Sequence, residues 1–395
     1  MTSEWNHFAL GEITELVIDY RGKTPKKLGG DWCKQGYRAL SAKNIKTGRI
    51  VQAETIRYID ESLYRKWMKD EVQRGDILIT SEAPFGQIFF WDSDEKIVLS
   101  QRLFCVRIKP EYDARFIYYY MTTPEFQSEL DGRATGTTVI GLRQPELMKC
   151  IIRCPEIQEQ KVIAAILSSI DAKIIANEKV NDNLEQQAAS IFAEWLNTCA
   201  DFSTIGDMAH NILDYSPIAS EKIRLLNSSD ITEGVFPVAP LVPNKDLKGH
   251  FKKRFQFGDI LYSEIRPRNH HYGVVLFDAS DYIASTRLMV IRAIENKVSP
   301  AMLYQYLLLP EVEAEFTLKT ESRSGTFPQG NYADMASIQV PYSPTDSQTA
   351  VSETLSQIRY TIAQNQLESQ RLAELRDTLL PKLMSGELDV SAVQL

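Results

Sequence analysis

The chain has 395 residues, 44% hydrophobic and 24% charged, which predicts a globular protein of two or three domains. Its formal net charge of −8 argues against a simple DNA-coating protein, because that class is strongly basic. An acidic chain can still bind DNA through local basic patches or basic partner subunits, and a protein that never meets DNA stays open on charge alone. No apolar run is long enough to cross a bilayer, and the N-terminus lacks a signal-peptide pattern. Five scattered cysteines suggest a reduced, cytoplasmic setting.

The first globular segment is expected over residues 1–156. Its sequence YRALSAKNIKTGRIV, from residue 37, predicts a strand, a polar turn and a second strand. A buried strand begins after Gly75-Asp76, and Pro84 and Gly86 interrupt the apolar pattern that follows. Another strand, an amphipathic helical stretch, a loop with a short helix and a last strand complete the segment.

A long helix is predicted next, from Gln158 to about Asn197. It contains neither Pro nor Gly, and its apolar residues recur at alternating steps of four and three, which is the heptad pattern of a helix packed along another helix. The predicted seam consists of Ile163, Leu167, Ile170, Ile174, Asn177, Asn181, Leu184, Ala188, Ile191 and Trp195. A helix of this length measures roughly 60 Å, more than one compact domain needs, so we expect a partner helix.

The second globular segment, about residues 200–345, repeats the order of the first. IRLLNSSDITEGVF corresponds to YRALSAKNIKTGRI, FGDILYSE to RGDILITSE, and ASTRLMVIR to LSQRLFCVR. Between these anchors the two segments differ freely: APFGQI in the first corresponds to the longer and more basic IRPRNHHYGVV in the second. The repeat predicts one internal duplication.

The partner helix is predicted in the same chain, from Ser347 to about Met384. With an offset of 188 positions its first turns match the first helix, and Asn365 matches Asn177 at an otherwise apolar position, where Asn costs stability but fixes the register. The match then loosens, because Arg376 falls where Ala188 sits, although Leu372, Leu375, Leu379 and Leu383 continue an apolar stripe. The alternative is two unrelated amphipathic helices that pack on separate cores.

These elements predict an α+β fold: two duplicated α/β domains joined by two long helices in an antiparallel coiled coil with a pseudo-twofold axis. The expected domains are residues 1–156, 157–199, 200–346 and 347–388, followed by a tail at 389–395.

Catalytic motifs are not recognised in the sequence. It matches neither a phosphate-binding loop, a dinucleotide-binding glycine pattern, a nucleophile elbow nor a zinc-protease motif. Cys150 and Cys154 have loose metal-ligand spacing without a second pair, so buried thiols are the better interpretation. Asp76 and Asp259 recur in Gly-Asp-Ile-Leu, where an Asp after Gly usually belongs to a turn. The sequence therefore favours recognition over catalysis, and we expect no metal site.

Two stretches resemble a known family. RLAELRDTLLPKLMSGEL, residues 371–388, resembles the C-terminal region of specificity subunits of type I restriction–modification systems, and PEIQEQKVIAAILSSID, residues 155–171, resembles the start of their central helical region. The paired Gly-Asp-Ile-Leu strands followed by Ser-Glu fit the same family. The loosened register after Asn365 is one departure from the pattern.

The resemblance implies a non-catalytic subunit. Each globular segment would be a target-recognition domain that reads one half of a split, asymmetric site in double-stranded DNA, and the helices would set the spacing between the half-sites. Two modification subunits would dock on the helices and methylate adenine with S-adenosylmethionine, and restriction subunits that use ATP and Mg could join. This chain itself would bind no cofactor.

Candidate base-reading residues are the long or polar side chains in the predicted loops. In the first segment they are Lys26, Lys27, Lys43, Asn44, Gln87, Arg133 and Thr137, and in the second Arg266, Arg268, Asn269, His270, Arg323, Ser324 and Thr326. Arg266, Arg268 and Asn269 are the strongest, since they lie in a Pro-containing insertion between two strands and such loops carry binding. Candidate phosphate contacts are Lys245, Lys248, Lys252, Lys253 and Arg254. For each of these residues the alternative is a solvated surface position.

Two other functions remain possible from the sequence. The chain could serve a single fused methylase–nuclease polypeptide, or it could be a coiled-coil scaffold that bridges two proteins without DNA. The scaffold predicts no salt-sensitive affinity for DNA.

Overall fold

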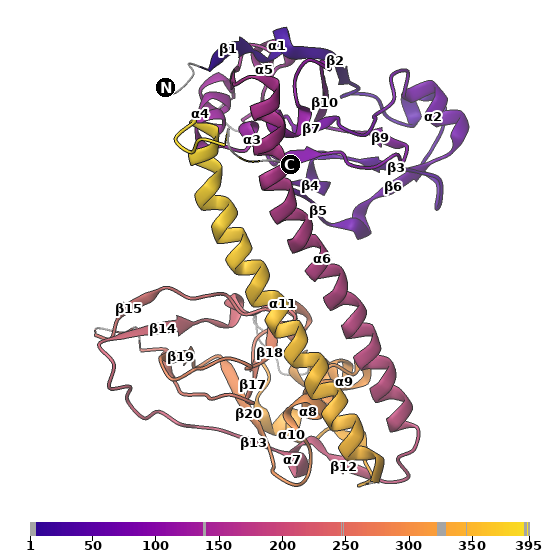
Figure 1. The fold of residues 1–395 in the computed structure, drawn as a ribbon. Helices are drawn as coiled ribbons and strands as arrows, with labels where there is room; N and C mark the ends of the chain where they lie inside the picture. Colours follow the sequence, from indigo (N-terminus) through magenta and orange to yellow (C-terminus); the bar gives the residue numbers. More distant parts are fainter. Residues whose placement is uncertain are drawn as a thin grey trace. The chain divides into compact units, whose positions relative to one another are not determined.

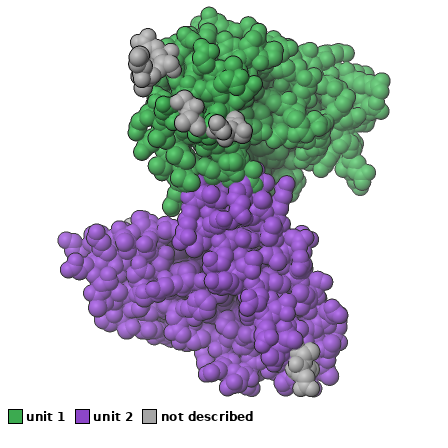
Figure 2. All heavy atoms as spheres, in the orientation of Figure 1, with its two compact units in different colours: residues 1–172, 373–395 green, residues 173–372 purple. Residues whose placement is uncertain are grey.

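The computed structural model describes residues 5–136, 140–245, 247, 249–321, 329–344, 346–390 and 393. The chain divides into two compact units (Figures 1 and 2). Unit 1 comprises residues 1–172 and 373–395, and unit 2 comprises residues 173–372. Each of the two long helices therefore contributes one part of its length to each unit.

Unit 1 is an α+β unit that carries the first part of one long helix and the last part of the other. Its strands are β1 (Asn6–Ala9), β2 (Thr14–Asp19), β3 (Tyr37–Leu40), β4 (Ile45–Lys46), β5 (Arg49–Ile50), β6 (Arg57–Ile59), β7 (Ile77–Thr80), β8 (Ile88–Phe90), β9 (Ile97–Leu99), β10 (Leu103–Ile108) and β11 (Ile151–Cys154). Its shorter helices are α1 (Leu10–Ile13), α2 (Glu61–Trp67), α3 (Ala114–Met121), α4 (Pro124–Arg133) and α5 (Gln144–Leu147), with 3₁₀ turns η1 (Lys26–Leu28), η2 (Ala42–Asn44) and η3 (Ala53–Thr55).

The core of unit 1 is built around a four-stranded sheet in the order β2-β10-β7-β8, flanked by a three-stranded sheet in the order β6-β3-β9. β10 runs antiparallel to both β2 and β7, while β3 and β9 pair in parallel. α3 packs six consecutive buried residues, from Phe116 to Met121, against one side of this core.

Unit 2 repeats this architecture. Its strands are β12 (Phe202–Thr204), β13 (Ala209–Asn211), β14 (Lys222–Leu226), β15 (Leu241–Pro243), β16 (Phe251–Lys253), β17 (Ile260–Ser263), β18 (Tyr272–Val274), β19 (Tyr282–Ser285), β20 (Leu288–Ala293) and β21 (Gln339–Pro341). Its shorter helices are α7 (Ile205–Met208), α8 (Pro300–Leu307), α9 (Pro310–Glu321) and α10 (Tyr332–Ala336), with 3₁₀ turns η4 (Ser228–Asp230) and η5 (Pro267–Asn269).

The sheets of unit 2 have the connectivity expected of a duplicate. The order β13-β20-β17-β18 corresponds to β2-β10-β7-β8, and the parallel pair β14 and β19 corresponds to β3 and β9. The sequence anchors that repeat between the halves thus occupy matching strands.

The two long helices are α6 (Ile157–Leu196) and α11 (Asp346–Met384). In unit 1, Ile163 and Leu167 of α6 share a core with Leu383 and Met384 of α11. In unit 2, the other end of α6 packs with the other end of α11, where Ala188 and Leu355 belong to one core. The helices pair antiparallel in both units (Figure 1), as predicted. None of the described helices meets the length and apolarity that a bilayer span requires.

The break in the apolar seam near Arg376 is explained by a polar network inside unit 1. Asp171 of α6 accepts hydrogen bonds from Tyr119 at 2.6 Å and from Arg376 at 2.8 Å. The predicted stripe is wrong at Leu375, whose side chain is 47% exposed. An ion pair therefore replaces apolar contact at this turn.

A second polar layer lies inside unit 2. The buried amide of Asn177 donates to Glu368 at 2.8 Å and to Ser369 at 3.2 Å, and Asn365 donates to Asn181 at 2.8 Å. The Asn177 hydrogen bond lowers the pKa of Glu368. These bonds can form in one alignment of the helices only, which supports a role in register.

We expect Asn177→Leu to keep or raise the melting temperature while it loosens pairing specificity, because an apolar seam tolerates several alignments. Light scattering after size exclusion should then show more than one association state. Asn183→Leu adds the same leucine at an exposed position of α6 and is the matched control. A single species with unchanged mass for Asn177→Leu would contradict this role.

The repeated Gly-Asp-Ile-Leu aspartates are more than turn residues. Asp76 accepts from Gln73 N at 2.8 Å and from Arg107 Nε at 2.9 Å, and the side chain is 1% exposed. Asp259 repeats both contacts with Gln256 N and Arg292. Each unit thus holds one buried carboxylate that closes a turn and ties the neighbouring strand through an arginine.

Candidate nucleic-acid interface

Three loops meet in unit 1, and their described residues are 41–52, 80–88 and, for the third loop, 134–136 and 140–142. The Gln87 side-chain oxygen accepts from the Thr47 amide at 3.0 Å, and Gly48 N donates to Ile88 O at 3.1 Å, so the first two loops are bound together. Leu142 N donates to Ser81 O at 2.9 Å and attaches the third loop. Hydrogen bonds thus join all three loops at the turn between β7 and β8.

Unit 2 joins the corresponding loops in the same way. Glu233 N donates to His270 O at 2.9 Å and Gly234 N to Tyr272 O at 2.8 Å, which connects residues 227–235 to the loop 264–272. Gly330 N donates to Glu264 O at 2.8 Å, the contact that corresponds to Leu142 with Ser81. The two loop sets therefore share a backbone plan and differ in their side chains.

Three predicted lysines of unit 1 are exposed, and one of them, Lys43, lies on these loops. Lys43 is exposed in η2, and Lys26 and Lys27 are exposed in η1, next to α2. Arg133, at the end of α4, is held by Glu129 at 2.8 Å. Thr137 lies outside the described residues.

Asn44 and Gln87 are engaged within unit 1. Asn44 is 1% exposed, and its amide accepts from Ser41 and donates to Thr55 at 3.0 Å. It closes the turn between β3 and β4. Because its side chain is buried there, the prediction that Asn44 reads a base does not fit the structure. Gln87 keeps partial exposure while its oxygen holds Thr47.

Four of the predicted residues of unit 2 lie in η5 or directly beside it. Arg268 is 71% exposed and contacts Glu321 of α9 at 3.3 Å. Arg266 and Asn269 are exposed, and His270 is half-buried between two glutamates. Arg323, Ser324 and Thr326 lie outside the described residues.

Only some of the basic side chains in the stretch before β17 are exposed. Lys253 is 5% exposed, and its ammonium donates to Leu288 O at 2.7 Å. Burial lowers the pKa of Lys253. The expected phosphate contact at Lys253 is therefore wrong, whereas Lys245 and Lys252 are exposed; Lys248 lies outside the described residues.

One pair of arginines was missed by the sequence reasoning. Arg102 follows β9. Its guanidinium pairs with Glu82 at 2.9 Å, and its backbone carbonyl accepts from Ser81 N at 2.9 Å, which places it beside the loop 80–88. Arg287 repeats the position in unit 2, where its carbonyl accepts from Glu264 N. The signal was available, because both arginines lie in the aligned SQR and STR anchors.

Three basic side chains on or beside these loops contact carboxylates of the same chain. Arg102 faces Glu82, Arg268 faces Glu321, and His270 faces both Glu233 and Glu313. An approaching phosphate would exchange with these carboxylates, which are partly exposed. Such a surface can recognise a polar ligand even though the net charge of the whole chain is negative.

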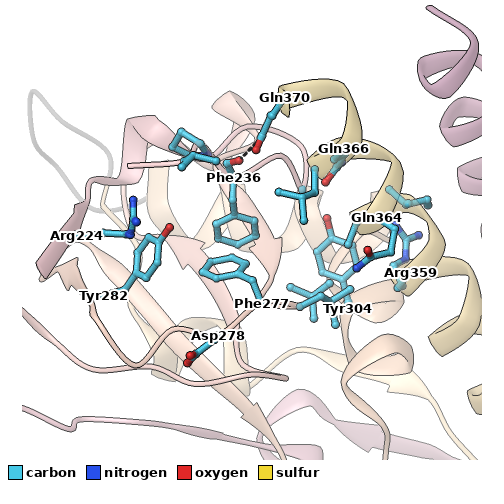
Figure 3. Close-up of a pocket in the computed structure, with 18 of the residues that line it drawn as sticks. Arg224, Phe236, Phe277, Asp278, Tyr282, Tyr304, Arg359, Gln364, Gln366 and Gln370 are labelled. Carbon is cyan, nitrogen blue, oxygen red and sulfur yellow. Dashed lines mark hydrogen bonds between the residues drawn. The ribbon is translucent and has the colours of Figure 1, made fainter. Parts of the chain in front are cut away.

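A hollow of about 500 Å³ lies in unit 2 between α11 and the strands β14, β18 and β19 (Figure 3). Its floor carries Phe236 and Phe277, whose ring centres are 5.2 Å apart, and Gln370 of α11 donates to Phe236 O at 2.7 Å. Its two arginines are both held in ion pairs, Arg224 by Asp281 and Arg359 by Glu185. The hollow is suited to apolar packing rather than to phosphate.

The cysteines with ligand-like spacing are buried. Burial raises the pKa of Cys150 and of Cys154 to about 12, so both stay thiols near neutral pH. Within the part of the chain that the structure describes, no group of three or more His, Cys, Asp or Glu could hold a metal ion.

A family model and two related proteins that match this chain all belong to type I restriction systems. The family model described as type I restriction modification DNA specificity domain matches residues 2–186 and 204–376. The chain is 32% identical over 179 residues to the type I restriction enzyme HindI specificity subunit of Haemophilus influenzae, covering 45% of this chain and 39% of that protein. It is 28% identical over 194 residues to the MjaVIII specificity subunit of Methanocaldococcus jannaschii, covering 48% and 44%. The matched part thus spans less than half the length of each relative.

The fold is also similar to a solved structure. The crystal structure of the type I restriction–modification system S subunit from M. genitalium aligns with a TM-score of 0.62 over 96% of each chain, at 16% identity. This likeness confirms the predicted α+β fold with two α/β regions and long paired helices. Because the family model matches both halves and most of the sequence, the chain belongs to the family of type I restriction–modification DNA specificity subunits.

Proposed function

We propose that each unit reads one half of a split, asymmetric DNA site through its three joined loops. The observation that carries this proposal is that the two loop sets share a backbone plan and differ in the side chains they present. A common scaffold with different loops is what reading two different half-sites requires.

The same proposal assigns the partners. The long helices would dock two modification subunits, which methylate adenine with S-adenosylmethionine, and restriction subunits that use ATP and Mg could join the complex in the cytoplasm. These partners would supply much of the phosphate neutralisation, which makes an acidic chain acceptable. The four-part domain division expected from the sequence belongs to this proposal too.

We expect Arg268→Ala to weaken binding at the half-site read by unit 2 by about tenfold to a hundredfold, since one good base contact contributes about 1–3 kcal/mol. Discrimination at the other half-site should not change. The measurement is competition binding of the complex with its modification subunits, using duplexes altered in one half-site at a time.

Lys297→Ala is the matched control, because Lys297 is an exposed cation of unit 2 in the turn before α8. An equal loss on specific and random DNA for Arg268→Ala would show that Arg268 touches phosphate only. Binding that ignores the sequence of both half-sites would contradict the proposed function.

A further inference from the structure

His270 lies between two carboxylates from different parts of unit 2. Its Nδ1 is 2.9 Å from Glu233 Oε1, and its Nε2 is 3.0 Å from Glu313 Oε1. Glu233 belongs to the loop 227–235, and Glu313 belongs to α9. One imidazole thus connects the loop 264–272 to two neighbouring elements.

Both contacts need a donor on the ring, because an ionised carboxylate can only accept a hydrogen bond. A neutral imidazole has one N–H and can satisfy one glutamate, whereas the imidazolium has two and can satisfy both. The hydrogen bond to Glu233, and then that to Glu313, raises the pKa of His270 above its ordinary value. The geometry therefore favours the charged ring.

The backbone around this bridge is strained. The backbone φ angles are 47° at Arg266, 54° at His270 and 47° at Glu233. Residues other than glycine rarely adopt this left-handed backbone region. Such conformations persist only where the surrounding contacts hold them. The two side-chain contacts of His270 act on the same segment that presents Arg268 and Asn269.

We propose that His270 is a positioning residue, which clamps residues 266–270 between Glu233 and Glu313 and so holds Arg268 and Asn269 in the geometry that reads DNA. This inference rests on the proposed function of unit 2 and adds the residue that holds the reading loop in place. The corresponding loop in unit 1, residues 82–87, carries no histidine, so the device belongs to one half-site only.

The two carboxylates beside the ring raise the pKa of His270 by more than burial lowers it. Glu233 and Glu313 face it directly, the Tyr272 ring centre lies 5.8 Å away, and Arg268 is paired with Glu321 on α9. Since the folded-state pKa is raised, the clamp is complete below the ordinary value near 6.5 and is lost as pH rises through the raised value.

The first test measures the loop without DNA. In the full chain, hydrogen exchange of peptides covering residues 264–272 is followed from about pH 6 to about pH 8.5, corrected for the intrinsic pH dependence of exchange. We expect protection to fall roughly tenfold as the ring loses its proton. His270→Gln should lack this response, and His270→Arg, which donates to two carboxylates without titrating, should keep protection at both pH values.

His210→Gln is the matched control, because His210 is an exposed histidine on β13 of the same unit. A loop whose protection is independent of pH in the parent chain, or a pH response that survives in His270→Gln, would overturn the clamp.

The second test measures reading. The complex with its modification subunits is bound to a duplex of its methylated motif, and to duplexes changed in either half-site. Discrimination at the unit 2 half-site should fall about tenfold in His270→Gln and be restored in His270→Arg. Unchanged discrimination in His270→Gln would overturn the positioning role. If the parent complex recognises no motif, the proposed function is wrong. The hydrogen-exchange experiment still decides whether His270 holds the loop 264–272.

Discussion

Insertion of one heptad into both long helices is expected to abolish modification at the native motif. The insertions are placed after Ala172 in α6 and after Leu372 in α11, where the two units divide, so each unit keeps its own helix pairs. Seven residues add about 10.5 Å of helix, the length of about three base pairs. If the helices set the spacing, modification should stop or move to half-sites about three base pairs farther apart, as a methylation map would show.

The matched control adds the same seven residues after Leu395, where they leave both helices and the buried Val390 of unit 1 unchanged. Thermal unfolding of the double insertion should resemble that of the parent, which excludes misfolding as the cause. Continued methylation of the original motif with its original spacing would contradict the role of the helices as a ruler.

Arg292→Met is expected to destabilise unit 2 by about 3 kcal/mol, because it leaves the buried Asp259 carboxylate without its charge partner. Asp259 is 0% exposed, and Arg292 reaches it with two hydrogen bonds, at 2.6 and 2.8 Å. Arg107→Met should destabilise unit 1 by at least as much, since Arg107 is 18% exposed whereas Arg292 is 34% exposed. Denaturant unfolding followed by hydrogen exchange should report each loss in the strands of its own unit.

Arg74→Met is the surface control. Arg74 pairs with Asp92 and Asp94 at an exposed site, and removal of such a pair should change stability little. If Arg292→Met and Arg74→Met were equally mild, the buried pair would not be a structural anchor of the duplicated fold.

The fold was predictable because its signals are local and repeated. Heptad spacing predicted α6 and α11, and the aligned Gly-Asp-Ile-Leu and Arg-Leu anchors predicted matching strands before their pairing was known. The apolar stripe of α11 was wrong at Leu375, where Arg376 takes a place in the packing by pairing with Asp171. Periodicity cannot anticipate an ion pair with a residue on another helix.

The candidate interface was less predictable because its contacts join distant residues. Asn44 looked like a base reader, yet the recurrence of a polar pair at Ser41 and Asn44 and at Asn227 and Asp230 could have identified a turn closed by side chains. Nothing in the local sequence couples His270 to Glu313, 43 residues later. Arg102 and Arg287 were visible in the repeat, and only the structure places them beside the loops.

The central claim is that this chain selects the DNA sequence that its complex modifies. The most direct measurement is a map of adenine methylation in DNA from cells that carry the modification partner, with and without this chain. We predict methylation at one split, asymmetric motif that disappears when the chain is removed. A methylation pattern that is the same in both cells, with both proteins confirmed to be produced and assembled, would contradict the account.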